Sequence, residues 1–413
     1  MGNDLRLKVL VIAPHLSIHD VGEGPLAHHL VKAMCKHADV TILALEAANG
    51  PPLASQLPEA EVVTWQEPSW LAKNRFVRTM IKPHVFYLSR QVKKWLSAEL
   101  AKGRQFDIAH QMLPAAPRYP TALRFFPIPY VIGSLGGSLP TPAAFQNEAT
   151  TEKLSTKLRF LDPFRFRYDP WLRASYGKAD LVMGVAPYME DVMSAAPIRK
   201  FEPFLTIGLD EVPDPITRTR KPGELTMLSV GRVTRTKGLR DSVRALALLK
   251  DLPHVRLVCV GDGDDLPECR AEAEKLGVQD RVTFLGRLPR DQVEAHYRQS
   301  DLLIFPSFRE SMGAVLYEAM RWSLPVITTR LGGPGSIVDE TCGLQVDVKT
   351  PSQLAEDLAA AIRKIAFDPE LGQRLGTAAR QKVLQEALWE QKADRLIKIY
   401  RKTLGSGETV QEG

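Results

Sequence analysis

Cysteine is scarce in this chain of 413 residues. The four cysteines, Cys35, Cys259, Cys269 and Cys342, are far apart, and none forms a CxxC pair or has a histidine at the spacing of a metal site. Cys259 lies in an apolar run, which is typical of a packed side chain. The sequence therefore predicts neither a disulfide framework nor a zinc site, and we expect no metal ion and no cofactor.

Long hydrophobic runs are also missing. No window reaches the roughly 18 to 20 apolar residues that a transmembrane helix needs. The first residues lead directly into a strand-like segment, without the apolar core and cleavage site of a signal peptide. We therefore expect an unprocessed cytoplasmic protein.

Basic residues exceed acidic ones, with a net charge of +6, and the excess is concentrated. Residues 70–104 hold nine Lys and Arg against one acid, Glu99, and residues 153–178 hold seven more among six aromatic residues. Basic stems beside aromatic rings suit peripheral contact with an anionic membrane, such as the inner face of the plasma membrane. A solvated helix face near buried aromatics explains the same pattern. No nucleic-acid-binding module accompanies the charge, so no nucleic-acid partner is expected.

The length exceeds what one hydrophobic core usually organises, so two domains are expected. Short apolar runs alternate with helical patterns in both halves, which predicts an α/β fold with two doubly wound parallel sheets. The expected strands are 7–13, 39–45, 61–65, 106–110, 130–133 and 180–184 in the first half, and 225–230, 255–260, 281–285, 301–305, 325–328 and 343–346 in the second.

Glycine and proline interrupt residues 204–223, which predicts the join between the domains there. We expect a first domain at 1–205 and a second at 206–387. A C-terminal helix at 388–404 is expected to pack back on the first domain, and 405–413 to form a disordered tail.

Two glutamates, Glu310 and Glu318, lie eight residues apart where a loop leads into a helix predicted over 313–322. Backbone N–H groups at such a helix start suit a phosphate, and a carboxylate on either side suits a ligand with hydroxyls at both ends. A nucleotide sugar has this pattern. The alternative is that both glutamates are ordinary helix residues, one favouring the macrodipole and one solvated.

Two cations, Arg232 and Lys237, follow the strand predicted at 225–230. Both can reach one diphosphate, Arg through its planar fork and Lys as a point charge. An enzyme that expels a nucleoside diphosphate without a metal needs such positive charge on the leaving group. The alternative is a pair of surface basic residues in a loop.

Ligands of open α/β sheets collect at the carboxyl ends of the strands, and the first half offers two such ends. Gly22 and Gly24 follow the first strand and allow close approach of the backbone to a ligand. Ala27 stands where the dinucleotide fingerprint requires its third glycine, so NAD is not expected. His110 ends the strand at 106–110 and is expected to face a cleft, although a lone histidine is more often structural.

A series of motifs follows in order along the second half: Gly231-Arg232-x4-Lys237-Gly238, Val260-Gly261-Asp262-Gly263, Phe284-Leu285-Gly286, Phe305-Pro306-Ser307, Glu310-x7-Glu318-Ala319-Met320, Pro325-Val326-Ile327 and Gly332-Gly333-Pro334. Taken together, these motifs resemble family 4 of the retaining glycosyltransferases. Weaker similarity covers the first half: the glycine loop after the first strand, Phe-Asp-Ile-Ala-His, and Pro-Tyr-Val-Ile-Gly-Ser-Leu-Gly-Gly.

The resemblance implies the GT-B architecture, two Rossmann-like domains facing across a cleft, with the donor held mainly by the C-terminal domain. Arg232 and Lys237 would neutralise the donor diphosphate, Glu318 would bind the ribose hydroxyls, and Glu310 would hold hydroxyls of the transferred sugar. The other implied donor-binding residues are Ser311, Met312, Gly313 and Ala314 beside the sugar, Gly286 and Arg287 near the base, and Gly22 and Gly24 near the phosphate or acceptor.

Two positions depart from the family pattern. Ser311 stands where the family often has glycine, and Met112 stands at the second position of a His-x-His motif that many members carry. His110 is therefore the candidate for the catalytic histidine.

The sequence predicts a retaining transferase that moves a hexose from a nucleotide diphosphate sugar to a hydroxyl acceptor, a glycan or lipid-linked glycan in cell-surface polysaccharide synthesis. The catalytic candidates are Glu310, His110, Arg232 and Lys237, with Glu310 positioning the sugar and not attacking it. A GT-B sugar phosphorylase or nucleotide-sugar epimerase would share the phosphate clamp. A non-catalytic, basic membrane-surface protein is a third reading, which leaves the glutamates unexplained.

Overall fold

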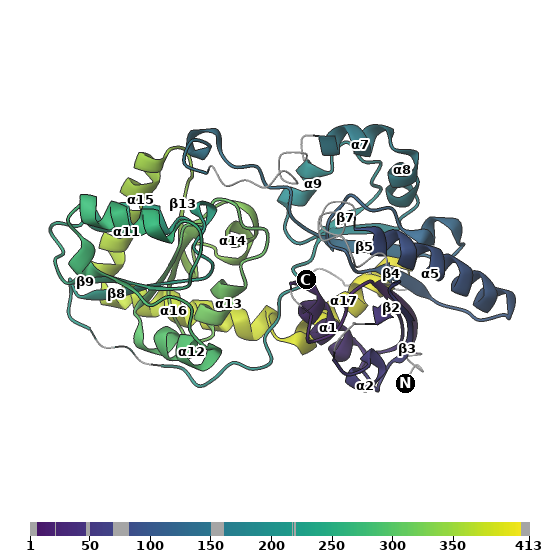
Figure 1. Cartoon of the computed structure of the whole chain (residues 1–413). Helices are drawn as coiled ribbons and strands as arrows, with labels where there is room; N and C mark the ends of the chain where they lie inside the picture. The colour runs from purple at the N-terminus through teal and green to yellow at the C-terminus, as the bar shows by residue number, and fades with distance from the viewer. Residues whose placement is uncertain are drawn as a thin grey trace. The chain divides into compact units, whose positions relative to one another are not determined.

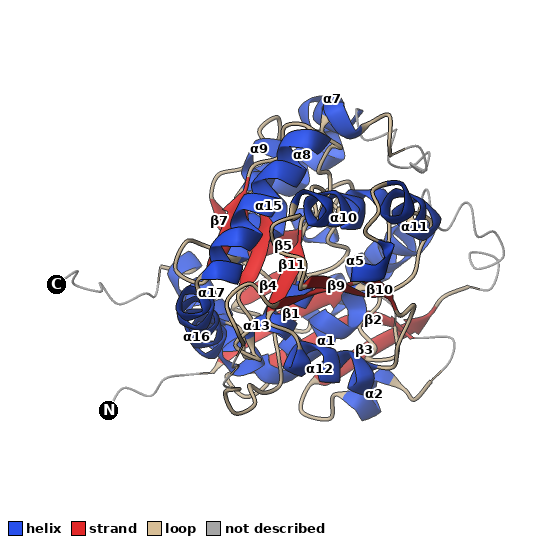
Figure 2. Ribbon diagram, turned by 90° about the vertical axis from the view of Figure 1, so that its left-hand side faces the viewer, coloured by secondary structure: helices blue, strands red, loops and turns tan. Residues whose placement is uncertain are grey.

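The structure is a computed structural model that describes residues 6–20, 22–46, 50–68, 82–149, 161–216, 218 and 220–405. The chain forms two compact units, drawn in Figure 1. Unit 1 comprises Met1–Ser138, Lys153–Gly208 and Trp389–Gly413, and unit 2 comprises Leu139–Glu152 and Leu209–Leu388. In both units helices cover the strands, as the blue and red elements of Figure 2 show.

Within the described residues, the sheet of unit 1 has seven parallel strands in the order β3-β2-β1-β4-β5-β6-β7. Their bounds are β1 (Leu7–Ala13), β2 (Ala38–Glu46), β3 (Glu61–Gln66), β4 (Ile108–Gln111), β5 (Tyr130–Leu135), β6 (Leu181–Gly184) and β7 (Phe201–Pro203). The first six strands agree with the expected ones to within a few residues at each end. The short β7 was not expected, because three residues are too few to show an alternation of apolar and polar side chains.

The helices of unit 1 are α1 (Glu23–Met34), α2 (Leu53–Gln56), α5 (Pro83–Ala101), η1 (Ala122–Phe125), α7 (Asp162–Tyr168), α8 (Pro170–Gly177), α9 (Tyr188–Val192) and α17 (Trp389–Thr403). The C-terminal α17 packs on α1, and its buried side chains, Leu396 and Tyr400 among them, join the apolar core beneath β1 and β2. The ring of Trp389 stacks on His29, with centroids 5.4 Å apart. Burial of apolar side chains thus attaches the C-terminal helix α17 to unit 1.

The sheet of unit 2 has, among the described residues, six parallel strands in the order β10-β9-β8-β11-β12-β13. Their bounds are β8 (Leu225–Val230), β9 (Val255–Val260), β10 (Val282–Phe284), β11 (Leu302–Phe305), β12 (Val326–Thr329) and β13 (Gly343–Val346). The helices are η2 (Ala143–Phe145), η4 (Arg235–Lys237), α10 (Leu239–Leu248), α11 (Leu266–Lys275), η5 (Gln279–Arg281), α12 (Arg290–Gln299), α13 (Ala314–Met320), α14 (Gly332–Ile337), α15 (Pro351–Phe367) and α16 (Pro369–Glu386).

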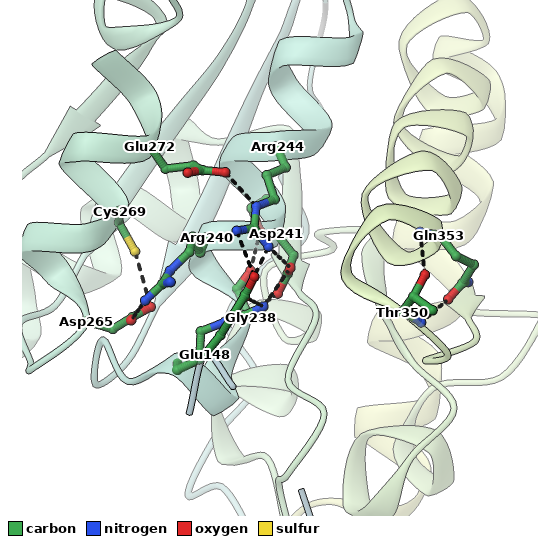
Figure 3. A network of polar contacts seen from close by, with 12 residues as sticks. Glu148, Gly238, Arg240, Asp241, Arg244, Asp265, Cys269, Glu272, Thr350 and Gln353 are labelled. Carbon is green, nitrogen blue, oxygen red and sulfur yellow. Dashed lines mark hydrogen bonds and ion pairs between the residues drawn. The ribbon is translucent and has the colours of Figure 1, made fainter. Parts of the chain in front are cut away.

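Local signals explain several of these elements. Helix α15 begins with a capping box, in which the Thr350 hydroxyl accepts from the Gln353 N–H while the Gln353 side chain returns to the backbone of Thr350 (Figure 3). Helix α10 is amphipathic and packs on α15 over the apolar face of the sheet. In this way the core of unit 2 holds the ends of β8 and β11 in place.

One segment lies elsewhere than the expected domain division put it. Residues Leu139–Glu152 were assigned to the first domain, but they group with unit 2. The reason is packing, because Phe145 is fully buried in the core of unit 2.

Some expectations concern residues outside the described ranges. The tail at 406–413 lies outside them, and so do residues 70–81 and 153–160 of the two basic stretches. The described residues of the chain contain no helix that is both long and apolar enough to cross a membrane.

Candidate functional site

The strand order of unit 2 has a topological switch point between β8 and β11. From there β9 and β10 follow on one side of β8, and β12 and β13 follow on the other side of β11. Open α/β sheets bind ligands at the carboxyl ends of strands beside such a switch point. Two loops leave the sheet there, residues 231–238 after β8 and residues 306–313 after β11. These are the loops that carry the two predicted cations and Glu310.

Backbone contacts hold the two loops together. The Phe308 N–H donates to the Thr236 carbonyl at 3.1 Å. Gly238 has a φ of 76°, and a Cβ there would lie 2.3 Å from the carbonyl oxygen of Pro306. Only glycine tolerates both the backbone conformation and this approach. The relative position of the loops is therefore set by the main chain before any ligand arrives.

The side chains of Lys237 and Glu310 meet across these loops. Lys237 Nζ forms an ion pair with Glu310 Oε2, and Glu310 Oε1 accepts from the Met312 N–H at 3.3 Å. Burial lowers the pKa of Lys237 to about 8, and the positive charge of Arg232 acts in the same direction. Sequence reasoning gave Lys237 and Glu310 to different parts of a ligand; in this structure they are partners.

The second predicted cation, Arg232, differs from Lys237. Its side chain is exposed, and it makes no hydrogen bond or ion pair with any residue that the structure describes. The two cations are close enough for the charge of Arg232 to act on the pKa of Lys237. Of the two predicted cations in the loop after β8, Lys237 is thus partly buried and Arg232 is exposed.

Glu318 lies in α13, which begins at Ala314 after Gly313 in the left-handed conformation, with a φ of 90°. The Tyr297 hydroxyl of α12 donates to Glu318 Oε2 at 2.9 Å. Burial raises the pKa of Tyr297 well above its ordinary value, and the nearby carboxylate adds to this. Tyr297 was missed by sequence reasoning, because a tyrosine in an amphipathic helix gives no sign of its partner.

The start of α14, after β12, also contacts the Glu310 loop. The Gly333 N–H donates to the Glu310 carbonyl at 3.0 Å. A Cβ at Gly333 would lie 2.5 Å from the Ser311 carbonyl oxygen and 2.4 Å from that of Met312. Glycine in the first turn of α14 therefore allows the Glu310 loop to pack against it.

Gly286 and Arg287 lie after β10, two strands away from β8. The Gly261 N–H donates to the Gly286 carbonyl at 2.7 Å, and Gly286 has a φ of 70°. A Cβ at Gly286 would meet no atom within 4 Å, and Arg287 is exposed. This loop borders open space, but among the described residues no hydrogen bond or ion pair joins it to Lys237 or Glu310.

The expectation that His110 faces a cleft is wrong. Its side chain is 1% exposed, Nε2 donates to the Gly133 carbonyl at 2.5 Å, and Nδ1 accepts from the Tyr400 hydroxyl at 2.6 Å. Burial lowers the pKa of His110 to about 4, so the ring is neutral near pH 7. With both nitrogens occupied, His110 is a structural residue of unit 1. Met112, at the position of the missing histidine, packs in the core.

The glycine loop of unit 1 lies at that sheet's own switch point, between β1 and β4. Gly22 has a φ of 96° and is exposed, so it allows the turn into α1. A Cβ at Gly24 would lie 2.9 Å from the Asp20 Cβ, so close packing within the loop requires glycine there. Between them, Glu23 accepts from the Ala115 N–H at 3.1 Å, a contact that the sequence did not indicate.

The structure offers no evident metal site among the residues that it describes, since no three His, Cys, Asp or Glu side chains gather there. All four cysteines are buried and free.

Two Rossmann-like units of strand order 3-2-1-4-5-6, the first with one more strand, define the GT-B fold. The comparisons with solved structures show this fold over nearly the whole chain. Sucrose-phosphate synthase from Thermosynechococcus elongatus matches with a TM-score of 0.64 at 20% identity, covering 97% of this chain and 100% of that one. HepE from Anabaena, solved in complex with UDP-glucose, matches with a TM-score of 0.60 at 18% identity and the same coverage.

The particular family is indicated by sequence. Residues 216–382 match the family described as "Glycosyl transferases group 1", so the resemblance expected from the motifs is confirmed for this segment. D-inositol 3-phosphate glycosyltransferase from Segniliparus rotundus is 34% identical over 192 residues, which are 45% of this chain and 42% of that protein. The chain spans less than half the length of this and other curated relatives that it matches.

Proposed function

We propose that the protein is a retaining glycosyltransferase that moves a hexose from a nucleotide diphosphate sugar to a hydroxyl acceptor. The observation that carries this proposal is the Lys237–Glu310 pair at the switch point of unit 2, with Arg232 exposed beside it. The match of this unit to group 1 glycosyl transferases supports it, as does the likeness in fold to HepE, which was solved with UDP-glucose.

The chemistry follows from the charges. As the bond from the sugar to the diphosphate breaks, negative charge grows on the diphosphate, and Lys237 and Arg232 stabilise it. Arriving phosphate competes with Glu310 for Lys237, which frees the Glu310 carboxylate to accept hydrogen bonds from sugar hydroxyls. Glu318, oriented by Tyr297, accepts from the ribose hydroxyls. The backbone of Gly313 and Ala314 borders the sugar, and Gly286 and Arg287 border the base.

Retention of configuration places the acceptor on the face that the diphosphate leaves. The transition state resembles an oxocarbenium ion, so Glu310 positions the sugar and forms no bond to it. The positive charge of Lys237 and Arg232 takes the part that a metal ion would otherwise play.

The first experiment is a thermal-shift screen of UDP, GDP, ADP and TDP, each with and without its glucose conjugate. One nucleotide should raise the melting temperature. In a second assay, release of that nucleotide from the matching nucleotide sugar should be at least about 100-fold slower in the Lys237→Ala and Glu310→Ala variants than in the wild type. Full turnover by both variants would refute the assignment. Lys349→Ala, an exposed lysine of the same unit, is the control.

A phosphorylase or an epimerase is distinguished by its products. An epimerase converts the nucleotide sugar without an acceptor, and a phosphorylase cleaves a glycosidic bond of a glycan with inorganic phosphate to give a sugar phosphate. NMR of the nucleotide sugar alone, of a glycan with phosphate and of the nucleotide sugar with glycan acceptors separates the three activities. A product that forms only with the acceptor supports the transferase.

We also propose that the acceptor is a glycan or lipid-linked glycan and that unit 1 binds an anionic membrane on the cytoplasmic side. Phe164 and Trp171, on α7 and α8, are 63% and 60% exposed, and Arg165 and Arg167 lie between them in the chain. Exposed aromatic rings beside arginines suit the interface of an anionic bilayer.

Liposome sedimentation tests this contact. Wild-type protein should sediment with vesicles that contain phosphatidylglycerol more than with neutral ones, and Phe164→Ser/Trp171→Ser should lose the difference. Phe367→Ser, which removes an aromatic ring that is 57% exposed on unit 2, is the matched control. Equal partitioning of the wild type into both vesicles would refute the contact.

A further inference from the structure

A short segment between β5 and α7 lies beneath the two loops that carry Lys237 and Glu310. It includes η2 and the turn that follows, residues 143–149, and it belongs to unit 2 although the strands on either side of it in the sequence belong to unit 1. The ring of Phe145 is fully buried against Phe308, with centroids 4.4 Å apart. Glu148, three residues later, turns toward the start of α10 (Figure 3).

Both side chains converge on one arginine. Arg235 is 3% exposed, and its guanidinium lies 5.3 Å from the ring centroid of Phe145 and 5.2 Å from that of Phe308. Its Nε donates to Glu148 Oε2 at 2.8 Å. Its two terminal nitrogens donate to the buried Asp241 carboxylate at 2.6 and 3.0 Å. Such a buried cation stays in place only while its partners do.

The arrangement extends outward through a second arginine. Arg244 donates to Glu148 at 3.1 and 3.2 Å and to Glu272 of α11 at 2.7 Å (Figure 3). Glu148 therefore joins Arg235 to Arg244, whereas in the part of the chain that the structure describes Glu272 forms no hydrogen bond or ion pair with Arg235. This difference provides a matched pair of glutamates within one network.

The network is anchored to the same turn that carries Lys237. Arg235 is the first residue of η4 and Lys237 the last, so the anchored arginine and the lysine share one turn. Phe308 precedes Glu310 by two residues, and its N–H is bonded to Thr236 between the two cations. Phe145 thus contacts Arg235 and Phe308, which lie two positions before Lys237 and Glu310 respectively, and Glu148 contacts Arg235.

We propose that Phe145 and Glu148 are positioning residues for Lys237, acting through Arg235. This inference rests on the proposed function, because it assumes that Lys237 stabilises the departing diphosphate. A cation that stabilises the negative charge of a transition state has to be in position before the reaction. Its displacement by about 1 Å can lower the rate on the order of a hundredfold. Lys237 itself has a flexible stem, so the rigidity comes from the turn that carries it.

The test compares Glu148→Gln with Glu272→Gln, both neutral and nearly isosteric. The probe is the glucose conjugate of whichever nucleotide the thermal-shift screen selects, and transfer gives kcat and KM. We expect Glu148→Gln to lower kcat about tenfold or more while KM changes by less than about threefold. Glu272→Gln should lower the melting temperature by a similar amount and leave kcat unchanged. Glu148→Asp, which keeps the charge, should restore part of the loss.

A double-mutant cycle separates positioning from general destabilisation. In the Lys237→Ala background, Glu148→Gln should cause no further fall in kcat, because the residue through which it acts is gone. A further fall of the same size would overturn the proposal, and so would equal kcat values for Glu148→Gln and Glu272→Gln. Phe145→Leu repeats the cycle from the aromatic side if Glu148→Gln does not fold. An inactive wild type would refute the proposed function, whereas an active wild type with additive variants refutes only this inference.

Discussion

The lowered pKa of Lys237 makes the affinity for a nucleoside diphosphate depend on pH in a defined direction. Lys237 is cationic below its pKa of about 8 and neutral above it. The phosphates are fully ionised across the range above neutrality, so their own charge does not change there. Raising the pH through 8 therefore removes positive charge from the site while the phosphates keep their charge, and affinity should fall.

The size of the effect follows from the titration. With a pKa of about 8, roughly nine tenths of Lys237 is charged near pH 7 and roughly one tenth near pH 9. If binding requires the charged form, Kd should rise about tenfold between these two values, which corresponds to about 1.4 kcal/mol. Binding should also take up protons in this range, because the phosphates raise the pKa of Lys237 in the complex.

Isothermal titration calorimetry with the selected nucleoside diphosphate measures both quantities, in buffers of different ionisation enthalpy. Lys237→Arg is the control, because a guanidinium stays charged throughout and its Kd should be nearly flat. A flat wild-type profile would refute the reasoning. An equal loss of affinity in Lys237→Arg would assign the titration to another group.

Three further predictions concern other contacts of the structure. Tyr297→Phe removes the hydroxyl that orients Glu318. The ribonucleoside diphosphate should therefore bind severalfold more weakly, while binding of its 2′-deoxy analogue should hardly change. Equal losses of affinity for both ligands would contradict the assignment of Glu318 to ribose. His110→Asn should lower the melting temperature and leave kcat within about threefold of the wild type; a large loss of kcat in a folded variant would make His110 catalytic after all. The pKa of His110 is lowered from 6.5 to about 4, so the unfolded chain binds a proton at this residue before the folded chain does. The contribution of His110 to the free energy of unfolding is therefore complete above about pH 6.5 and falls by up to about 3 kcal/mol as the pH drops toward 4. Denaturant titrations of the variant should lack this loss of stability at low pH. Transfer after dialysis against EDTA should equal transfer with added Mg²⁺ or Mn²⁺, since Lys237 and Arg232 supply the positive charge; an absolute need for either metal would refute this.

The order of elements could be read from the sequence because it depends on local patterns. All twelve expected strands begin and end within two residues of the observed ones, because alternation and turn residues act over a few positions. The positions of Arg232, Lys237 and Glu310 after strands were also predictable. Since parallel strands place their carboxyl ends at one edge, these loops had to lie at the same edge; they adjoin because β8 and β11 are neighbours in the sheet.

The environment of His110 could not be read in this way. Its partner Tyr400 lies 290 residues away, and nothing near His110 in the chain distinguishes a cleft-facing ring from a buried one. A strand end is where both kinds of histidine occur. The packing of α17 on α1 determines which of the two this residue is.

The sequence by itself determined the two doubly wound sheets, the segments that form their strands, and the positions of Arg232, Lys237 and Glu310 after strand ends, because periodicity and turn chemistry are local. Only the tertiary structure decided that Lys237 pairs with Glu310, that Tyr297 orients Glu318, and that residues 143–149 pack beneath the loops of unit 2. These contacts join segments up to about 160 residues apart. They arise from the packing of whole elements, because burial leaves each charge and hydroxyl only the partners that its neighbours bring within reach.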